Sequence, residues 1–187
     1  MTTDRVLSVP FELRLDTTAL RRAGQLEGVV ADLYRQMRVP VTGYACQLVG
    51  TTHEAEDIVQ LGFLRLWDAL QRDEGIDNVR SWVFRVVHNL AIDHVRRAGV
   101  IRAHEQREAP TQVSADGASQ EDAAIARQQI EIGLSALTDR ERHALMLRAE
   151  GLRYQEIAEV LGTTSSAVSV YLVRGLKKFA QKTGSRP

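Results

Sequence analysis

The sequence predicts an all-α fold of two small helical domains joined by a flexible linker. Aromatic residues make up only 5% of the 187 residues, and runs of Ala, Leu, Glu, Arg and Gln favour helix. Apolar residues recur at helical spacing in two separate stretches, and no convincing run of alternating β-branched residues indicates a strand. Residues 99–119 lose this periodicity and become small and polar, a composition that cannot bury enough surface to fold alone.

The first helix is predicted from Leu26 to about Val49, where apolar residues recur at helical spacing. Pro40 lies inside this pattern and is expected to divide or kink the helix. Gly50 then makes a turn, and Thr51 or Thr52 is predicted to cap the next helix.

The second helix is predicted to run to about Leu70, with Ile58, Leu61, Leu64 and Leu66 as its apolar content. Residues 73–78 read as a loop, and a third helix is expected from Val79 to about Ala98. We therefore expect an N-terminal arm of residues 1–25, a first domain of residues 26–98 and a linker of residues 99–119.

The second domain is predicted over residues 120–182, with a tail of residues 183–187. Its first helix draws on apolar residues between Ala124 and Leu137, and the pattern T-D-R-E at residues 138–141 is a capping box for the next one. Residues 154–161 should form a short helix that ends at Gly162 in a left-handed turn. Thr164 or Ser165 should cap the last helix, whose predicted inward stripe is Val168, Leu172, Leu176 and Phe179.

These last two helices have the layout of a helix-turn-helix, which reads duplex DNA with the N-terminal part of its second helix. The E-I-A-x-x-L-G core at residues 156–162 makes an ordinary helical hairpin the weaker interpretation. Serine hydroxyls and valine methyls would meet base edges, and basic residues would supply affinity for phosphate. The predicted DNA-facing residues are Ser165, Ser166, Ser169, Val170, Val173, Arg174, Lys177 and Lys178.

The helix at residues 79–98 carries a second candidate DNA surface. Aromatic, amide and guanidinium side chains share one of its faces, and such a mixture suits unstacked bases and phosphates. For Trp82, packing at the junction with the preceding helix is about as good an interpretation as base contact. The residues of this face are Trp82, Arg85, Val86, Asn89, Asp93, Arg96 and Arg97.

Composition and charge exclude several classes of protein. The net charge is zero, but an acidic stretch at residues 54–77 stands apart from basic stretches at residues 80–107 and 171–187. Cys46 is the only cysteine, which excludes an internal disulfide and fits a cytoplasmic protein. We expect no signal peptide, no membrane insertion, no metal and no cofactor. The histidines are scattered and no phosphate loop or nucleophile motif is present, so we expect no enzyme activity.

The segment W-V-F-R-V-V-H-N-L-A-I-D-H-V-R-R at residues 82–97 resembles the promoter-melting segment of bacterial RNA polymerase sigma factors. The stretch A-E-D-I-V-Q-L-G-F-L-R-L-W at residues 55–67 is similar to their core-polymerase-binding helix, and the helix-turn-helix resembles the part that reads the −35 element. The resemblance covers roughly residues 27–98 and 121–180 and is to the small extracytoplasmic-function (group IV) factors of the sigma-70 family, which keep only regions 2 and 4.

The resemblance implies a role for several residues. Asp57, Gln60, Phe63 and Trp67 would dock on the clamp coiled coil of the beta-prime subunit of core RNA polymerase, and region 4 would contact the beta flap. The loop of Asp77, Asn78 and Arg80 would pocket a flipped base of the −10 element. The melted strand and nearby backbone would be held by Trp82, Arg85, Asn89, Arg96 and Arg97.

The chain departs from the family pattern in the core-binding helix, where Leu61-Gly62 follows the glutamine in place of an acidic residue. Gly62 should weaken that helix by up to ~1 kcal/mol relative to alanine. The family also often has basic residues near Ser169 and Tyr171, which this chain lacks.

The main hypothesis is thus a non-catalytic sigma subunit that recruits polymerase to promoter −10 and −35 elements and opens the DNA, with an anti-sigma protein as a further partner. A stand-alone helix-turn-helix repressor or activator with a helical sensor domain is the alternative. It would bind DNA without polymerase and usually needs a dimer interface or ligand pocket, neither of which the sequence shows clearly.

Overall fold

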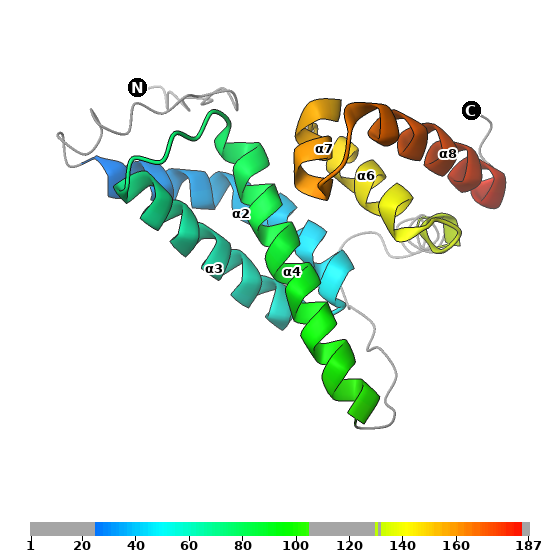
Figure 1. The fold of residues 1–187 in the computed structure, drawn as a ribbon, viewed down its shortest axis with the longest axis horizontal. Helices are drawn as coiled ribbons and strands as arrows, with labels where there is room; N and C mark the ends of the chain where they lie inside the picture. The colour runs from blue at the N-terminus through cyan, green and yellow to red at the C-terminus, as the bar shows by residue number, and fades with distance from the viewer. Residues whose placement is uncertain (1–24, 105–129, 131, 185–187) are drawn as a thin grey trace, which may run out of the picture.

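The computed structural model describes residues 25–104, 130 and 132–184, and all regular secondary structure among them is helical, as predicted. Residues 1–24 of the predicted arm, most of the linker, Ala124 and Ile125 lie outside the described residues. Helices α2 (Leu26–Val49), α3 (Thr52–Gln71) and α4 (Val79–His104) form one group. Helices α6 (Asp139–Ala149), α7 (Tyr154–Leu161) and α8 (Ser165–Thr183) form a second group, which adjoins α4 (Figure 1).

Helix α2 is continuous, so the prediction that Pro40 divides it is wrong. Proline removes one backbone hydrogen bond and crowds the preceding turn, at a cost of about 3 kcal/mol in a helix interior. The turns on either side bury Met37, Val41 and Tyr44 against the neighbouring helices. This tertiary packing holds the helix together where local propensity does not.

Helix α3 begins where the sequence predicts, because the Thr51 hydroxyl accepts a hydrogen bond from the Glu54 backbone N–H at 3.3 Å. Its inner face buries Ile58 and Leu66, whereas Leu61 and Leu64 point outward with 43% and 62% of their surface exposed. Gly62 is buried, and a Cβ atom built there would lie 2.7 Å from Val87 Cγ2 of α4. Glycine therefore allows α3 and α4 to approach closely.

Helix α4 begins at Val79 as predicted, and the Asn78 side-chain oxygen accepts a hydrogen bond from the Ser81 N–H at 3.0 Å. Its buried stripe contains Val83, Val87 and Ala91. The helix continues through Gly99 to His104, so the predicted end near Ala98 is wrong. One exposed glycine costs only about 1 kcal/mol, which is too little to stop an established helix.

The second group follows its predicted caps. Thr138 and Glu141 form the capping box of α6, Gly162 has a left-handed φ of 58°, and the Thr164 hydroxyl accepts from the Ala167 N–H at 3.2 Å. The predicted inward stripe of α8 is wrong at Leu176, which is 57% exposed. Gly175 is buried in its place, and a Cβ there would lie 2.9 Å from Leu145 Cδ1 of α6.

The stripe of α8 therefore runs through Val168, Leu172 and Gly175. Spacings of four and three residues follow the helix period more closely than two successive spacings of four. Glycine has no hydrophobic side chain, so a search for apolar residues at helical spacing does not detect Gly175. This is the residue at which α8 packs against α6.

Candidate nucleic-acid interface

The loop before α4 and the first turns of α4 form one wall of a cavity of about 400 Å³. Asp77, Asn78, Trp82 and Arg85, all predicted to contact the −10 element, line it. The opposite wall comes from α7 and the residue before it. This wall consists of Arg153, Gln155, Glu156 and Glu159.

Hydrogen bonds cross from this loop to the second group of helices. The Asn78 amide donates from Nδ2 to Glu156 Oε1 at 2.7 Å. The Arg80 guanidinium donates to the Glu150 backbone carbonyl, and its Nη2 also lies 3.7 Å from Glu150 Oε2. Burial lowers the pKa of Arg80, and the negative charges of Glu150 and Glu156 offset part of that shift. The guanidinium charge is thus partly removed from water, with two carboxylates nearby to balance it.

The other predicted −10 residues follow along the outer face of α4. Arg85, Asn89, Arg96 and Arg97 are exposed. Trp82 is half-buried, because it packs against the hydrophobic core and also lines the cavity. Packing against the core agrees with the first interpretation of Trp82, and base contact stays a prediction.

A cluster of the buried Tyr44 and His88 with the half-buried His143 joins the two groups of helices. Tyr44 Oη of α2 lies 2.8 Å from His88 Nδ1 of α4, and the His88 ring meets the His143 ring of α6 edge to face at 5.4 Å. Burial, followed by the positive potential of His143 and Arg140, lowers the pKa of His88 to about 4. Burial likewise lowers the pKa of His143. Both rings are thus held neutral at pH 7.

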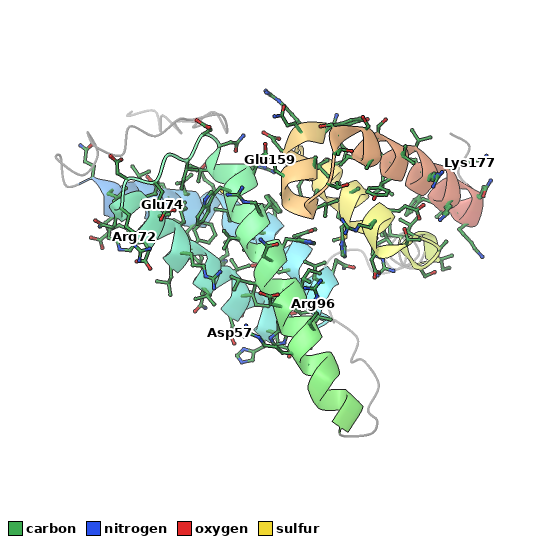
Figure 2. The ribbon with its side chains drawn as sticks, viewed as in Figure 1. Asp57, Arg72, Glu74, Arg96, Glu159 and Lys177 are labelled. Atoms are coloured by element: carbon green, nitrogen blue, oxygen red, sulfur yellow. The ribbon has the colours of Figure 1, made fainter. Side chains whose placement is uncertain are left out.

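The predicted duplex-reading face of α8 points to solvent. Ser165, Ser166, Val170, Arg174 and Lys177 are exposed, and Ser169 is half-buried. Lys177 lies toward the outer end of the helix (Figure 2). The cap residue Thr164 at the N-terminus of the helix is also exposed.

Lys178 differs from the other basic residues of α8. Its Nζ donates to both carboxylate oxygens of Glu141, at 2.7 and 2.9 Å. Glu141 is buried, and its hydrogen bonds to Lys178 hold the pKa of the carboxyl below its ordinary value. The sequence identified Glu141 only as a cap, so this ion pair was missed.

A second cavity of about 620 Å³ lies between α2 and α3. Gln60, Phe63 and Trp67 line it, and these are three of the four predicted polymerase-binding residues. Phe63 is buried at the bottom, edge to face with Tyr34 at 5.0 Å, so it shapes this groove more than it presents a surface. Asp57 is exposed earlier on α3, with His53 Nε2 3.7 Å from its carboxylate.

Two family models match the chain in this order. The sigma-70 region 2 model matches residues 33–100, and the sigma-70 region 4 model matches residues 127–179. The ECF RNA polymerase sigma factor SigL of Mycobacterium tuberculosis is 32% identical over 164 residues, which cover 81% of this chain and 89% of SigL. The chain is a sigma factor of the sigma-70 family.

The sigma factor SigE of Mycolicibacterium smegmatis is also 32% identical, over 79% of this chain, and the chain spans 59% of the length of SigE. Among solved structures, the sigma factor RpoE in complex with the anti-sigma factor NepR from Bartonella quintana has the same fold. That match has a TM-score of 0.68 at 19% identity and covers 83% of this chain and 99% of RpoE. As a member of the family, the chain is a non-catalytic specificity subunit that directs RNA polymerase to promoters.

The contacts of Glu150 and Glu156 with the loop before α4 were not predicted. Glu156 is the third residue of the α7 capping box and Glu150 is the C-cap of α6, so both have a local explanation in the sequence. Sequence spacing cannot show that a carboxylate with a local role also reaches another domain. Figure 2 shows Glu159 on the same side of α7, toward α4.

The described part of the chain holds no cluster of three or more His, Cys, Asp or Glu side chains placed to bind a metal ion. Within that same part, no helix has the length and apolarity needed to cross a membrane.

Proposed function

We propose that this sigma factor belongs to the extracytoplasmic-function (group IV) subgroup and acts as an alternative factor that opens promoters in response to a stress or signal. Two regions with a connecting segment, and relatives that carry the ECF name, support this assignment. It would act in the cytoplasm and associate with the nucleoid when active.

The observation that carries the melting role is the convergence of Asp77, Asn78, Trp82 and Arg85 on one cavity. Its volume of about 400 Å³ falls in the range of roughly 300–1,000 Å³ typical of small-ligand sites. A base flipped from the −10 element would enter there, at an unstacking cost of a few kcal/mol. Asn89, Arg96 and Arg97 continue along α4 and would hold the strand beyond it.

The α8 face would read the −35 element as duplex. The N-terminal part of α8 would meet base edges with Ser165, Ser166, Ser169 and Val170. Farther along the helix, Arg174 and Lys177 would contact phosphates. Exposed valines at positions 170 and 173 suit contact with thymine methyl groups.

The groove between α2 and α3 would bind the beta-prime clamp of core polymerase. Its lining is largely apolar and includes the exposed Leu64, as expected of a protein-binding surface. Asp57 and Gln60 would supply polar contacts at its edge. Region 4 would contact the beta flap, and because RpoE is solved with NepR, we propose that an anti-sigma factor also binds this chain.

Gel filtration with bacterial core polymerase, followed by transcription from a genomic promoter library, tests this function. Co-elution and promoter-selective transcripts are expected. Binding to duplex DNA with no association with polymerase would instead identify a stand-alone repressor or activator.

A further inference from the structure

The outward face of α8 carries a short row of side chains along the proposed −35 surface. Ser166, Val170, Val173 and Lys177 are spaced by four, three and four residues, so they follow one another along one side of the helix. All four are exposed, and the two valines leave 43% and 65% of their surface open to solvent. The buried stripe of α8 lies on the opposite side, so this row points away from the core.

The part of α8 that would meet base edges cannot make paired hydrogen bonds with them. Such contacts need the forked or amide side chains of arginine, asparagine or glutamine, or a lysine. Residues 165–173 contain none of these and no acidic residue. The serines both donate and accept hydrogen bonds, so they tolerate several base edges. Sequence discrimination in this part of the helix therefore depends on Val170 and Val173.

A valine in the major groove recognises one feature of DNA. The C5 methyl of thymine is the only methyl group that a base presents there. Contact between the two apolar groups removes both from water and is favourable. Opposite another base, the valine would cover a donor or an acceptor without bonding to it, and an unpaired polar group is penalised. The two valines therefore favour thymine over the other bases.

The spacing of the valines limits where the two thymines lie. Side chains three residues apart on a helix have Cβ atoms about 5–6 Å apart. Base pairs stack at about 3.4 Å per step. The methyl that one valine reaches is thus one or two base pairs from the methyl that the other reaches.

The charge of the same face supports DNA as the partner of these valines. Arg174 lies beside the row and Lys177 at its end, and both are exposed. Helix α8 contains no aspartate or glutamate. Cations beside an apolar row suit a duplex, because phosphates border the groove in which the bases are read.

We propose that Val170 and Val173 are the specificity-determining residues of α8 and select a −35 element with two thymine methyls one or two base pairs apart. This inference rests on the proposed −35 role of α8. Methyl contacts then carry the discrimination that paired hydrogen bonds carry in other recognition helices.

The test measures binding of holoenzyme, formed from the full chain and core polymerase, to a labelled promoter duplex from the genomic library. Each thymine of the −35 element, on either strand, is replaced in turn by deoxyuridine, which lacks only the C5 methyl. Fluorescence anisotropy should show a roughly fourfold loss of affinity at each of two positions one or two base pairs apart, the effect of one buried methyl. The same replacement between the −35 and −10 elements should have no effect.

Alanine variants assign each methyl to a valine. Val170→Ala and Val173→Ala should each weaken binding of the natural duplex, and deoxyuridine at the matching position should then cost that variant nothing more. Both variants should fold, because alanine has the higher helix propensity. Val39→Ala is the matched control, since Val39 is 70% exposed on α2 and lines neither cavity. This control should retain the full deoxyuridine effect.

Three results overturn the inference: no effect of deoxyuridine at any position, an equal effect in the wild-type chain and both α8 variants, or a −35 element without an A·T pair. If deoxyuridine has no effect but the valine variants lose co-elution with polymerase, the valines bind protein, and the inference fails while the sigma function stands. If a scrambled −35 element is bound as tightly as the natural one, the proposed −35 role fails first and the inference fails with it.

Discussion

At the scale of single residues, the structure explains why Gly62 departs from the family pattern of the core-binding helix. The sequence marks it as a weak point of a helix, but α3 runs through it without interruption. Because a Cβ atom at Gly62 would lie 2.7 Å from Val87 Cγ2, the small residue sets the distance between α3 and α4.

Gly62→Ala should therefore destabilise the protein. Alanine adds up to ~1 kcal/mol of helix propensity, but overpacking a buried contact typically costs about 1–3 kcal/mol. Because the β-branched Val87 side chain has few alternative rotamers, the overpacking cost should exceed the gain in helix propensity. Urea unfolding measures the difference. Gly43→Ala, in an exposed part of α2 with open space around its Cα, should be neutral or stabilising.

Trp82 and Trp67 offer a matched pair for separating DNA opening from polymerase binding. Trp82→Ala should reduce open-complex formation, measured by permanganate reactivity of the −10 bases, more than co-elution with core polymerase. Trp67→Ala, in the groove between α2 and α3, should reduce co-elution, and its open-complex formation should recover at saturating factor because melting follows polymerase binding. Equal loss of both activities in Trp82→Ala, or no recovery in Trp67→Ala, contradicts this division of labour.

Arg174 and Lys178 make a similar contrast on α8. Arg174 is exposed, so Arg174→Ala should weaken −35 duplex binding and reduce its salt slope by about 1. Lys178 is bonded to Glu141, so Lys178→Ala should leave the slope unchanged and lower the free energy of unfolding. Anisotropy titrations across salt concentrations and urea unfolding give both quantities.

At the scale of helices, the sequence predicted where most of them begin, and it failed where burial or a missing side chain decided the outcome. Caps are local chemistry, so the sequence identified Thr138 and Gly162 and left two candidates each at the starts of α3 and α8, of which Thr51 and Thr164 are the caps. The division of α2 at Pro40 and the burial of Leu176 were wrong predictions, because packing in α2 and the approach of α6 to Gly175 depend on residues distant in sequence.

In the candidate site, too, local features were predicted and contacts between residues distant in sequence were missed. The loop before α4 and the outer face of α4 were predicted as a unit, and the structure brings four of those residues to one cavity. The opposite wall was missed because the Asn78–Glu156 hydrogen bond joins residues on different domains. No periodicity in either segment encodes that contact.

Glu141 contacts both α6 and α8, so its removal should weaken the start of α6 and the packing of α8. Its side chain caps α6 at the Thr138 N–H, 2.9 Å away, and receives Lys178 from α8. Glu141→Ala should lower stability by about 1–3 kcal/mol, from the lost cap and the lost ion pair. Urea unfolding tests this. Glu159→Ala is the comparison, since Glu159 is exposed and should cost far less.

At the scale of the whole molecule, the histidine contact makes the stability of the fold sensitive to acid. His88 has a pKa of about 4 in the fold, below its ordinary 6.5, so the folded chain binds a proton less readily than the unfolded one. Stability is then greatest above pH 6.5 and falls as the pH drops from 6.5 toward 4, by at most about 1.4 kcal/mol per pH unit for this group.

Urea unfolding between pH 7.5 and pH 5 should show this decline, and His88→Gln should flatten it. Arg140 and Arg142 strengthen the effect because they add positive charge near the two rings, whereas Asp139 opposes it at His143. His53→Gln is the control, since the His53 side chain is 88% exposed. An unchanged pH profile in His88→Gln would assign the acid response to other groups.

The ring contact between His88 of α4 and His143 of α6 joins the two domains. Any movement that parts the domains must bring both imidazoles into water. That step should become easier in mild acid, because an imidazole in water takes up a proton more readily than the buried His88 does.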